Sequence, residues 1–278
     1  MTSATAAGTW TLGDLSVNRM GLGAMRLTGD GPRDRAIAVL RRAVELGVNH
    51  IDTASFYFSA MRSANELINS ALSPYPDDLV ITTKVWPGRD PSGDWMWAET
   101  PAKLRGQVEE NLRQLGRDYL DVVNLRVPPS QQAGSLAAHF AALAELRDQG
   151  LIRHLGISNV TSAHLAEARA VAPVVCVQNR FALGAEADQH EMLRSCGELG
   201  IAYVPFFALA SATDSAEVDA VARAHGATPA QVRLAWTLQL GQHVLAIPGT
   251  GDPAHLEDNV AAATLTLTPA EMSLLGQR

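Results

Sequence analysis

Short apolar segments rich in β-branched residues alternate with longer segments of helical periodicity along the whole chain of 278 residues. The short segments predict eight strands, because runs of this length and composition between turn residues are typical of buried strands. The predicted strands are Arg19–Leu22, Val48–Ile51, Leu79–Thr83, Val122–Leu125, Ile152–Ile157, Val174–Val177, Ile201–Pro205 and Val244–Ile247. The predicted helices between and after them are Pro32–Leu46, Ser63–Leu72, Pro101–Leu115, Ser135–Gln149, Thr161–Val171, Glu186–Leu199, Asp214–His225 and Pro229–Leu240.

This alternation predicts an α/β fold, a (β/α)8 TIM barrel formed by a single domain over residues 1–278. An open, doubly wound parallel sheet also alternates in this way, so the pattern alone leaves that architecture open. Thr9–Asn18 predicts an N-terminal β-hairpin that closes the bottom of the barrel. Pro253–Ala263 and Pro269–Leu275 predict extra C-terminal helices.

Composition and charge exclude several classes of protein. Hydrophobic residues make up 47% of the chain, and the net charge is −7, so a large core is expected and a nucleic acid is not an expected partner. No apolar run reaches the ~18 residues of a membrane helix, so no membrane partner is expected. Cys176 and Cys196 form no disulfide framework, which favours a reducing compartment and a cytoplasmic location.

Polar residues follow five of the predicted strands at the point where each apolar run ends. The carboxyl ends of barrel strands meet at one rim, where barrel enzymes have their active sites. Taken singly, Asp52 could cap a turn and Lys84 could extend to solvent, but their shared position favours a site. The residues concerned are Asp52, Lys84, Arg126, the pair Ser158 and Asn159, and the pair Gln178 and Asn179.

These residue types indicate acid–base chemistry. A lysine held beside a carboxylate stays charged and lowers the pKa of a nearby phenol, and Tyr57 follows Asp52 by five residues. Such a phenol can protonate the alkoxide that forms when a carbonyl is reduced. The eight histidines show no spacing with Cys or Asp that suits a metal, so no metal site is expected.

Several segments, in order along the chain, resemble the aldo-keto reductase superfamily, and the resemblance covers nearly the whole sequence. Asp52–Tyr57 is similar to the D-T-A-x-x-Y motif, and Ile81–Lys84 is similar to I-x-T-K. The chain resembles most closely the bacterial pyridoxal reductase subgroup, with which it shares the Asn-Leu-Arg run that ends at Arg126. The remaining similar segments are Asn65–Leu72, Asn111–Asp121, Gly156–Asn159, Val177–Asn179, Val204–Phe207, Ile247–Thr250 and Glu257–Asn259.

The resemblance implies reduction of an aldehyde or ketone to an alcohol with NADP (NADPH), and NADH is the less favoured cofactor. It implies that Tyr57 donates the proton, Lys84 lowers its pKa, Asp52 holds Lys84, and hydride comes from the nicotinamide. The implied substrate is a small-molecule carbonyl, with a pyridoxal-like or other aromatic aldehyde as one hypothesis, and the protein is expected to be a monomer or a weak homo-oligomer. The implied cofactor-binding residues are Gly23, Ala24, Met25, Asp52, Ser158, Asn159, Gln178, Phe206, Phe207, Ala208, Leu209, Ile247, Gly249, Thr250, His255, Asp258 and Asn259.

The sequence departs from the family pattern at several positions. Arg126 stands where the family usually has histidine; it could polarise the carbonyl as a fixed cation, bind an anionic group of the substrate, or impair reduction. His255 stands where many members have an arginine for the 2′-phosphate, and Ser211–Thr213 replaces a glycine-rich loop. Phe56, Phe58 and Trp86 are expected to form an aromatic substrate pocket.

Two other functions compete with reduction. The first is a barrel that binds the cofactor but reduces weakly or not at all, as a redox sensor or accessory subunit; Arg126 and Phe58 motivate it. The second is a lyase or hydrolase in which Lys84 forms a Schiff base. The second is disfavoured, because a lysine held by Asp52 stays charged and is a poor nucleophile.

Overall fold

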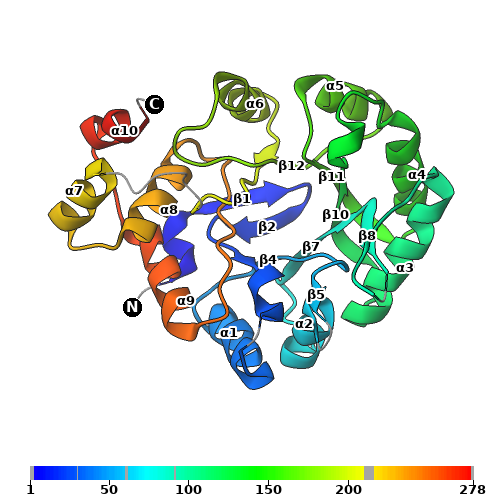
Figure 1. Ribbon diagram of the computed structural model, residues 1–278, viewed down its shortest axis with the longest axis horizontal. Coiled ribbons are helices and arrows are strands. Elements are labelled where there is room, and N and C mark those ends of the chain that lie inside the picture. The colour runs from blue at the N-terminus through cyan, green and yellow to red at the C-terminus, as the bar shows by residue number, and fades with distance from the viewer. Residues whose placement is uncertain (1–2, 30, 60–61, 91, 210–215, 277–278) are drawn as a thin grey trace.

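The strands form a curled parallel sheet at the centre of the molecule (Figure 1). The computed structural model describes residues 3–29, 31–59, 62–90, 92–209 and 216–276. The sheet has seven strands in the order β13-β12-β11-β10-β7-β4-β3, and its pairings are parallel. The strands are β3 (Leu22–Gly23), β4 (His50–Asp52), β7 (Val80–Val85), β10 (Leu120–Arg126), β11 (Ile152–Ser158), β12 (Cys176–Gln178) and β13 (Ala202–Tyr203).

Residues 244–249 close the sheet into the expected barrel. The prediction of a regular strand at Val244–Ile247 was wrong in detail, because this segment pairs only through single parallel bridges. Val244 bridges Tyr203 of β13 on one side, and Ala246 bridges Met20, just before β3, on the other. The segment therefore occupies the eighth strand position, and this closure distinguishes the barrel from an open sheet.

Helices surround the barrel and cover the outer face of its strands (Figure 1). Each predicted helix overlaps an observed one, although the predicted start of α7 at Asp214 lies outside the described residues. The α-helices are α1 (Arg33–Glu45), α2 (Ala64–Leu72), α3 (Leu104–Leu115), α4 (Ala137–Asp148), α5 (Ser162–Val171), α6 (Ala187–Glu198), α7 (Ala216–His225), α8 (Pro229–Gln239), α9 (Pro253–Ala261) and α10 (Pro269–Gly276). Short 3-10 turns are η1 (Ala4–Ala7), η2 (Ala24–Thr28), η3 (Pro101–Lys103), η4 (Pro129–Gln131) and η5 (Ala262–Thr264).

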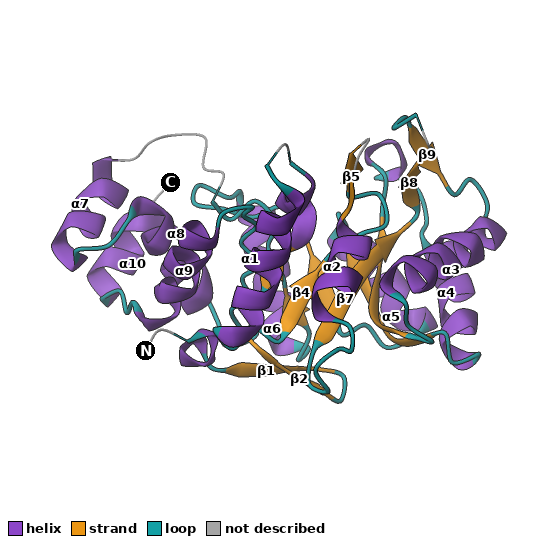
Figure 2. Cartoon of the chain, turned by 90° about the horizontal axis from the view of Figure 1, so that it is seen from below, coloured by secondary structure: helices purple, strands orange, loops and turns teal. Residues whose placement is uncertain are grey.

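The predicted N-terminal hairpin closes the bottom of the barrel. Strands β1 (Thr9–Leu12) and β2 (Leu15–Asn18) pair antiparallel, and in Figure 2 they lie below the barrel strands. Leu12 and Val17 are buried against side chains of the barrel interior. Access to the interior is therefore left to the opposite, carboxyl end of the strands.

Two small antiparallel ribbons project at that opposite end (Figure 2). The first pairs β5 (Phe58–Ser59) with β6 (Arg62–Ser63), and the second pairs β8 (Pro87–Arg89) with β9 (Trp95–Trp97). Gly93, with φ of 93°, stands in the turn between the strands of the second ribbon. The ribbons matter for function because they bring aromatic residues to the mouth of the barrel.

The buried Arg19 guanidinium holds the barrel closed. Its Nε donates to the Val244 carbonyl at 3.1 Å, and Nη2 donates to the carbonyls of Leu238, in α8, and of Gly241, the latter at 2.7 Å. Its Nη1 donates to the Ala7 carbonyl at 2.9 Å. One side chain thus satisfies carbonyls at the end of α8, in the eighth strand position and in the N-terminal turn.

We expect Arg19→Met to lower the free energy of unfolding by about 3 kcal/mol, because buried carbonyls lose a charged donor. Urea denaturation measures the change, with Arg33→Met at an exposed position of α1 as the control. A loss no greater than that of the control would mean that Arg19 does not hold the closure.

Candidate active site

A buried ion pair lies at the centre of the barrel mouth. Asp52 ends β4, and Lys84 is the penultimate residue of the neighbouring β7. The parallel register pairs Asp52 with Thr82, which lies on the same face of β7 as Lys84 and two residues before it, so the two charged side chains come together. Lys84 Nζ donates to Asp52 Oδ1 at 2.6 Å and to the Thr53 carbonyl at 3.0 Å. The two side chains are 2% and 4% exposed, so the pair is shielded from water.

The neighbours of Lys84 decide its charge. Burial by itself lowers the pKa of the ammonium group, but the Asp52 carboxylate and the Tyr57 side chain more than compensate, and the pKa lies above its ordinary value. Lys84 is therefore a charged ammonium at neutral pH. A permanent cation is consequently fixed in a part of the barrel that excludes water.

Tyr57 lies beside this cation. Lys84 Nζ is 4.9 Å from the centre of the Tyr57 ring. The turn after β4 is held by bonds from the Tyr57 amide to the Ala54 carbonyl and from the Ala64 amide to the Tyr57 carbonyl. Phe56 packs edge-on against Tyr57 at 5.2 Å between ring centres. The structure thus brings Asp52, Tyr57 and Lys84 together, as the sequence predicted.

Gln178 and Arg126 complete the polar part of the site. Gln178 Nε2 donates to Asp52 Oδ2 at 2.7 Å, while its buried Oε1 has no hydrogen-bond partner in the described part of the chain. Arg126 Nη1 donates to Ser158 Oγ at 3.1 Å, and its guanidinium carbon lies 4.8 Å from the centre of the Phe206 ring. Burial lowers the pKa of Arg126, while Tyr57 and Asp52 oppose that effect.

These groups open into a cavity of about 380 Å³ at the barrel mouth. Its walls are mainly apolar, as is usual for cavities that bind small molecules. The lining residues are Gly23, Met25, Arg26, Asp52, Phe56, Tyr57, Trp95, Arg126, Gln178, Pro205, Phe206, Phe207, Ala208, Leu209, Ile247, Pro248 and Gly249. Most of the cofactor-binding residues that the resemblance implied lie in this wall.

A second cavity of about 610 Å³ shares Met25 and Arg26 with the first. Thr250 and His255, which are also among the implied cofactor-binding residues, line it. Three arginines line it as well, namely Arg26, Arg35 and Arg62. The first cavity is therefore apolar around a buried ion pair, whereas the adjoining one carries mainly positive charge.

Several assigned residues lie outside both cavities. Ser158 and Asn159 stand just behind the first, where Ser158 is fully buried against Arg126 and Asn159 Nδ2 donates to the Val127 carbonyl. Ala24 is fully buried in the core. Asp258 is exposed on α9 and Asn259 is buried there, and neither lines either of these two cavities.

The aromatic wall differs from the predicted one. Trp86 is buried and stacks on His139, with ring centres 4.1 Å apart. The Gln107 side chain holds the Trp86 backbone in this position, because its Oε1 accepts from the Trp86 amide and its Nε2 donates to the Trp86 carbonyl. Phe58 lines a separate cavity of about 950 Å³ between the two ribbons. Trp95, on β9, lines the active-site cavity and packs against Phe56 at 5.7 Å. Phe56 and Trp95 thus form the wall that was assigned to Phe56, Phe58 and Trp86.

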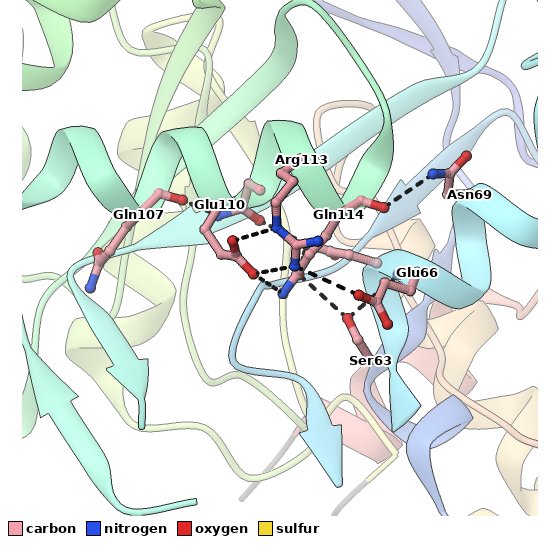
Figure 3. Close-up of polar contacts among 9 residues, drawn as sticks. Ser63, Glu66, Asn69, Gln107, Glu110, Arg113 and Gln114 are labelled. Atoms are coloured by element: carbon pink, nitrogen blue, oxygen red, sulfur yellow. Dashed lines mark hydrogen bonds and ion pairs between the residues drawn. The ribbon is translucent and has the colours of Figure 1, made fainter. Parts of the chain in front are cut away.

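A buried polar network supports the ion pair from behind. Thr53, which follows Asp52, donates its hydroxyl to Asn65 Oδ1 of α2 at 2.7 Å. Thr83, which precedes Lys84, donates its hydroxyl to Asn111 Oδ1 of α3 at 2.6 Å. Asn65 Nδ2 donates to Asn111 Oδ1 at 2.9 Å. Figure 3 shows how the network continues between the two helices through Gln114, Glu110, Arg113 and Glu66. The strands that carry the ion pair are thereby fixed to α2 and α3.

Comparison with known proteins identifies the family. The model of the aldo/keto reductase family matches residues 19–277. The chain belongs to the aldo/keto reductase family. The predicted resemblance is confirmed, and the protein is accordingly an oxidoreductase with a barrel fold.

Individual relatives agree with this assignment. The chain is 48% identical to pyridoxine 4-dehydrogenase of Escherichia coli, over 97% of this chain and 98% of that protein. It is 30% identical to a thermostable aldo-keto reductase solved with the inhibitor epalrestat, with a TM-score of 0.82 over 95% and 96% of the two chains. An aldo-keto reductase from Klebsiella pneumoniae, solved with NADPH, is 26% identical with a TM-score of 0.81, over 94% and 91%.

Neither a metal-binding cluster nor a membrane-spanning helix is found in the part of the chain that the structure describes. Within residues 3–29, 31–59, 62–90, 92–209 and 216–276, no three His, Cys, Asp or Glu side chains gather in a way that could hold a metal ion. In those same ranges no helix is long and apolar enough to cross a membrane. No role was predicted for Arg26 and Arg35, because their place in the second cavity depends on how η2 and α1 meet the loop before α9.

Proposed function

We propose that this aldo-keto reductase reduces an aldehyde or ketone to an alcohol with NADPH, with Tyr57 as the proton donor. The observation that carries the proposal is the position of Tyr57 in the cavity wall. The centre of its ring lies 4.9 Å from Lys84 Nζ, which forms a buried ion pair with Asp52. A buried cation next to a phenol stabilises the phenolate that remains after the proton has been given up.

The residues present fit a nicotinamide. The buried Oε1 of Gln178 lacks a partner in the described chain, and a carboxamide NH2 would supply the missing donor. The Phe206 ring offers a flat apolar surface in the same wall. Ser158, Asn159 and Gln178 would hold the carboxamide, and Phe206 would lie against the ring. The cofactor, when bound, supplies hydride to the carbonyl carbon.

The chain's own residues then have distinct roles. Tyr57 donates its hydroxyl proton to the carbonyl oxygen as the carbon is reduced, and solvent later restores that proton. Lys84 stabilises the resulting phenolate, and Asp52 keeps Lys84 charged and in place. Arg126 lines the same cavity, and its positive charge would stabilise the negative charge that develops on the carbonyl oxygen.

The cavity favours a planar aromatic aldehyde. Phe56 and Trp95 form an aromatic wall of the cavity apart from the Phe206 face assigned to nicotinamide, so an aromatic substrate ring would pack against these two side chains. The 48% identical relative from Escherichia coli is named as a pyridoxine 4-dehydrogenase, and the reverse of that reaction reduces an aromatic aldehyde. A pyridoxal-like aldehyde is therefore the first substrate to test.

Tyr57→Phe should lower kcat for NADPH-dependent reduction of pyridoxal by about 10²–10⁴-fold, because the proton donor is lost. The dissociation constant for NADPH should stay within about threefold, since the cavity walls are kept. Loss of NADPH absorbance measures reduction, and calorimetry measures binding.

Tyr119→Phe is the matched control, because this tyrosine is exposed and lines neither cavity. Undiminished reduction by Tyr57→Phe would overturn its role as proton donor. The second candidate function is a cofactor-binding barrel with little activity, which Arg126 suggests. It would be favoured if the wild-type protein bound NADPH but reduced none of a panel of aromatic aldehydes.

The second cavity favours NADPH over NADH. Arg26, Arg35 and His255 line it, and the carboxylate of Asp252, which forms an ion pair with Arg35, lies there too. The 2′-phosphate carries about two negative charges, which such a cluster would stabilise through charge-assisted hydrogen bonds. Arg26 and Arg35 would thereby compensate for histidine at position 255.

Replacement of both Arg26 and Arg35 by Gln should raise the dissociation constant of NADPH by roughly 10–100-fold, the equivalent of one or two charged hydrogen bonds. The constant for NADH should change by less than about threefold. Arg33→Gln, an exposed arginine of α1 outside this cavity, is the control. Equal weakening of both cofactors would show that these arginines do not bind the 2′-phosphate.

A further inference from the structure

Arg126 makes two contacts that the proposed function assigns to the cofactor. It ends β10 in register with Ser158 of β11, and its Nη1 donates to the Ser158 hydroxyl at 3.1 Å. Its guanidinium also lies over the Phe206 ring, 4.8 Å from the ring centre. Ser158 and Phe206 are the groups that would bind the carboxamide and the ring of nicotinamide.

A guanidinium and a nicotinamide cannot share this space. Both are flat groups, and each packs at about 3.5 Å from an aromatic face. A ring inserted between Phe206 and the guanidinium would need roughly 7 Å between them, well above the observed 4.8 Å. The hydroxyl of Ser158, which accepts from Arg126, is also fully buried, so it cannot turn to solvent for another partner.

We propose that Arg126 occupies the nicotinamide position in the free enzyme and that NADPH must displace its side chain in order to bind. This inference rests on the proposed function and deepens it, because Arg126 becomes a movable group and no longer a fixed cation. The displaced guanidinium would remain in the same cavity, whose wall also contains Tyr57 and Asp52. The negatively charged Asp52 carboxylate attracts the cation towards the position where the carbonyl oxygen is protonated.

The length of the side chain is essential to this inference. Arginine carries its guanidinium far enough from β10 to reach both Ser158 and Phe206. Histidine, the usual residue of the family at this position, is shorter and lacks the forked donors. An enzyme with histidine here would therefore leave the nicotinamide position open.

Arg126→His and Arg126→Ala should each bind NADPH about tenfold more tightly than the wild type, since no stacked, hydrogen-bonded group has to be displaced. Isothermal titration calorimetry measures the dissociation constant directly. NADPH is the probe because its reduced nicotinamide ring is neutral. Tighter binding by the variants therefore cannot come from relief of charge repulsion between Arg126 and a positively charged, oxidised ring. Pyridoxal reduction by Arg126→Ala should fall at the same time.

Arg89→Ala is the matched control. The guanidinium of Arg89 also lies over an aromatic ring, at 4.4 Å from Trp95, but it does not line the proposed cofactor cavities. Its removal should leave NADPH affinity within about twofold. The Arg89→Ala variant also shows how much the loss of one nearby positive charge, by itself, changes the affinity for the anionic NADPH.

The outcomes separate the two claims. Unchanged or weaker NADPH binding by both folded Arg126 variants would overturn the displacement, while a wild type that binds NADPH and reduces pyridoxal would leave the proposed function standing. A wild type that does not bind NADPH would overturn both. Circular dichroism of each variant checks folding, and the histidine variant serves if the alanine variant does not fold.

Discussion

The buried ion pair between Lys84 and Asp52 is the interaction on which the site depends. Two charges out of contact with water are costly unless each is paired and hydrogen-bonded. Here Lys84 also donates to the Thr53 carbonyl, and Asp52 also accepts from Gln178. The barrel meets this demand by bringing the carboxyl ends of neighbouring parallel strands together, and the network through Asn65 and Asn111 holds those strands to α2 and α3.

The rest of the mouth follows from this centre. Tyr57 has a cation beside it because the turn after β4 leads back over Lys84. Gln178 is oriented by its bond to Asp52, and this orientation leaves its carbonyl oxygen without a partner in the described chain. Arg126 is one of the residues at which the sequence departs from the family pattern. Its contacts with Ser158 and Phe206 explain how an arginine can be accommodated there, and in our proposal NADPH must displace it from both.

The features that depend on strand periodicity could be predicted from the sequence. Polar residues at strand ends predicted Asp52, Lys84 and Arg126, because parallel strands in a barrel place their ends on one rim. The aromatic wall could not be predicted in this way, since it depends on how a ribbon pairs. The pairing of Arg89 with Trp95 brings that tryptophan to the cavity, whereas Trp86 is buried on His139. Arg26 and Arg35 were missed because elements far apart in sequence meet around them.

The charge of Lys84 is the most direct test of this account. The pKa of its ammonium is raised, so the titration of Lys84 should have its midpoint above pH 10.5, the ordinary lysine value. Nitrogen-15 NMR of the labelled lysine Nζ can follow this titration, with Lys103, an exposed lysine, as internal control. In Asp52→Asn the pKa should fall, because burial then acts without the carboxylate. A neutral Lys84 amine in the wild type at pH 8 would contradict the account.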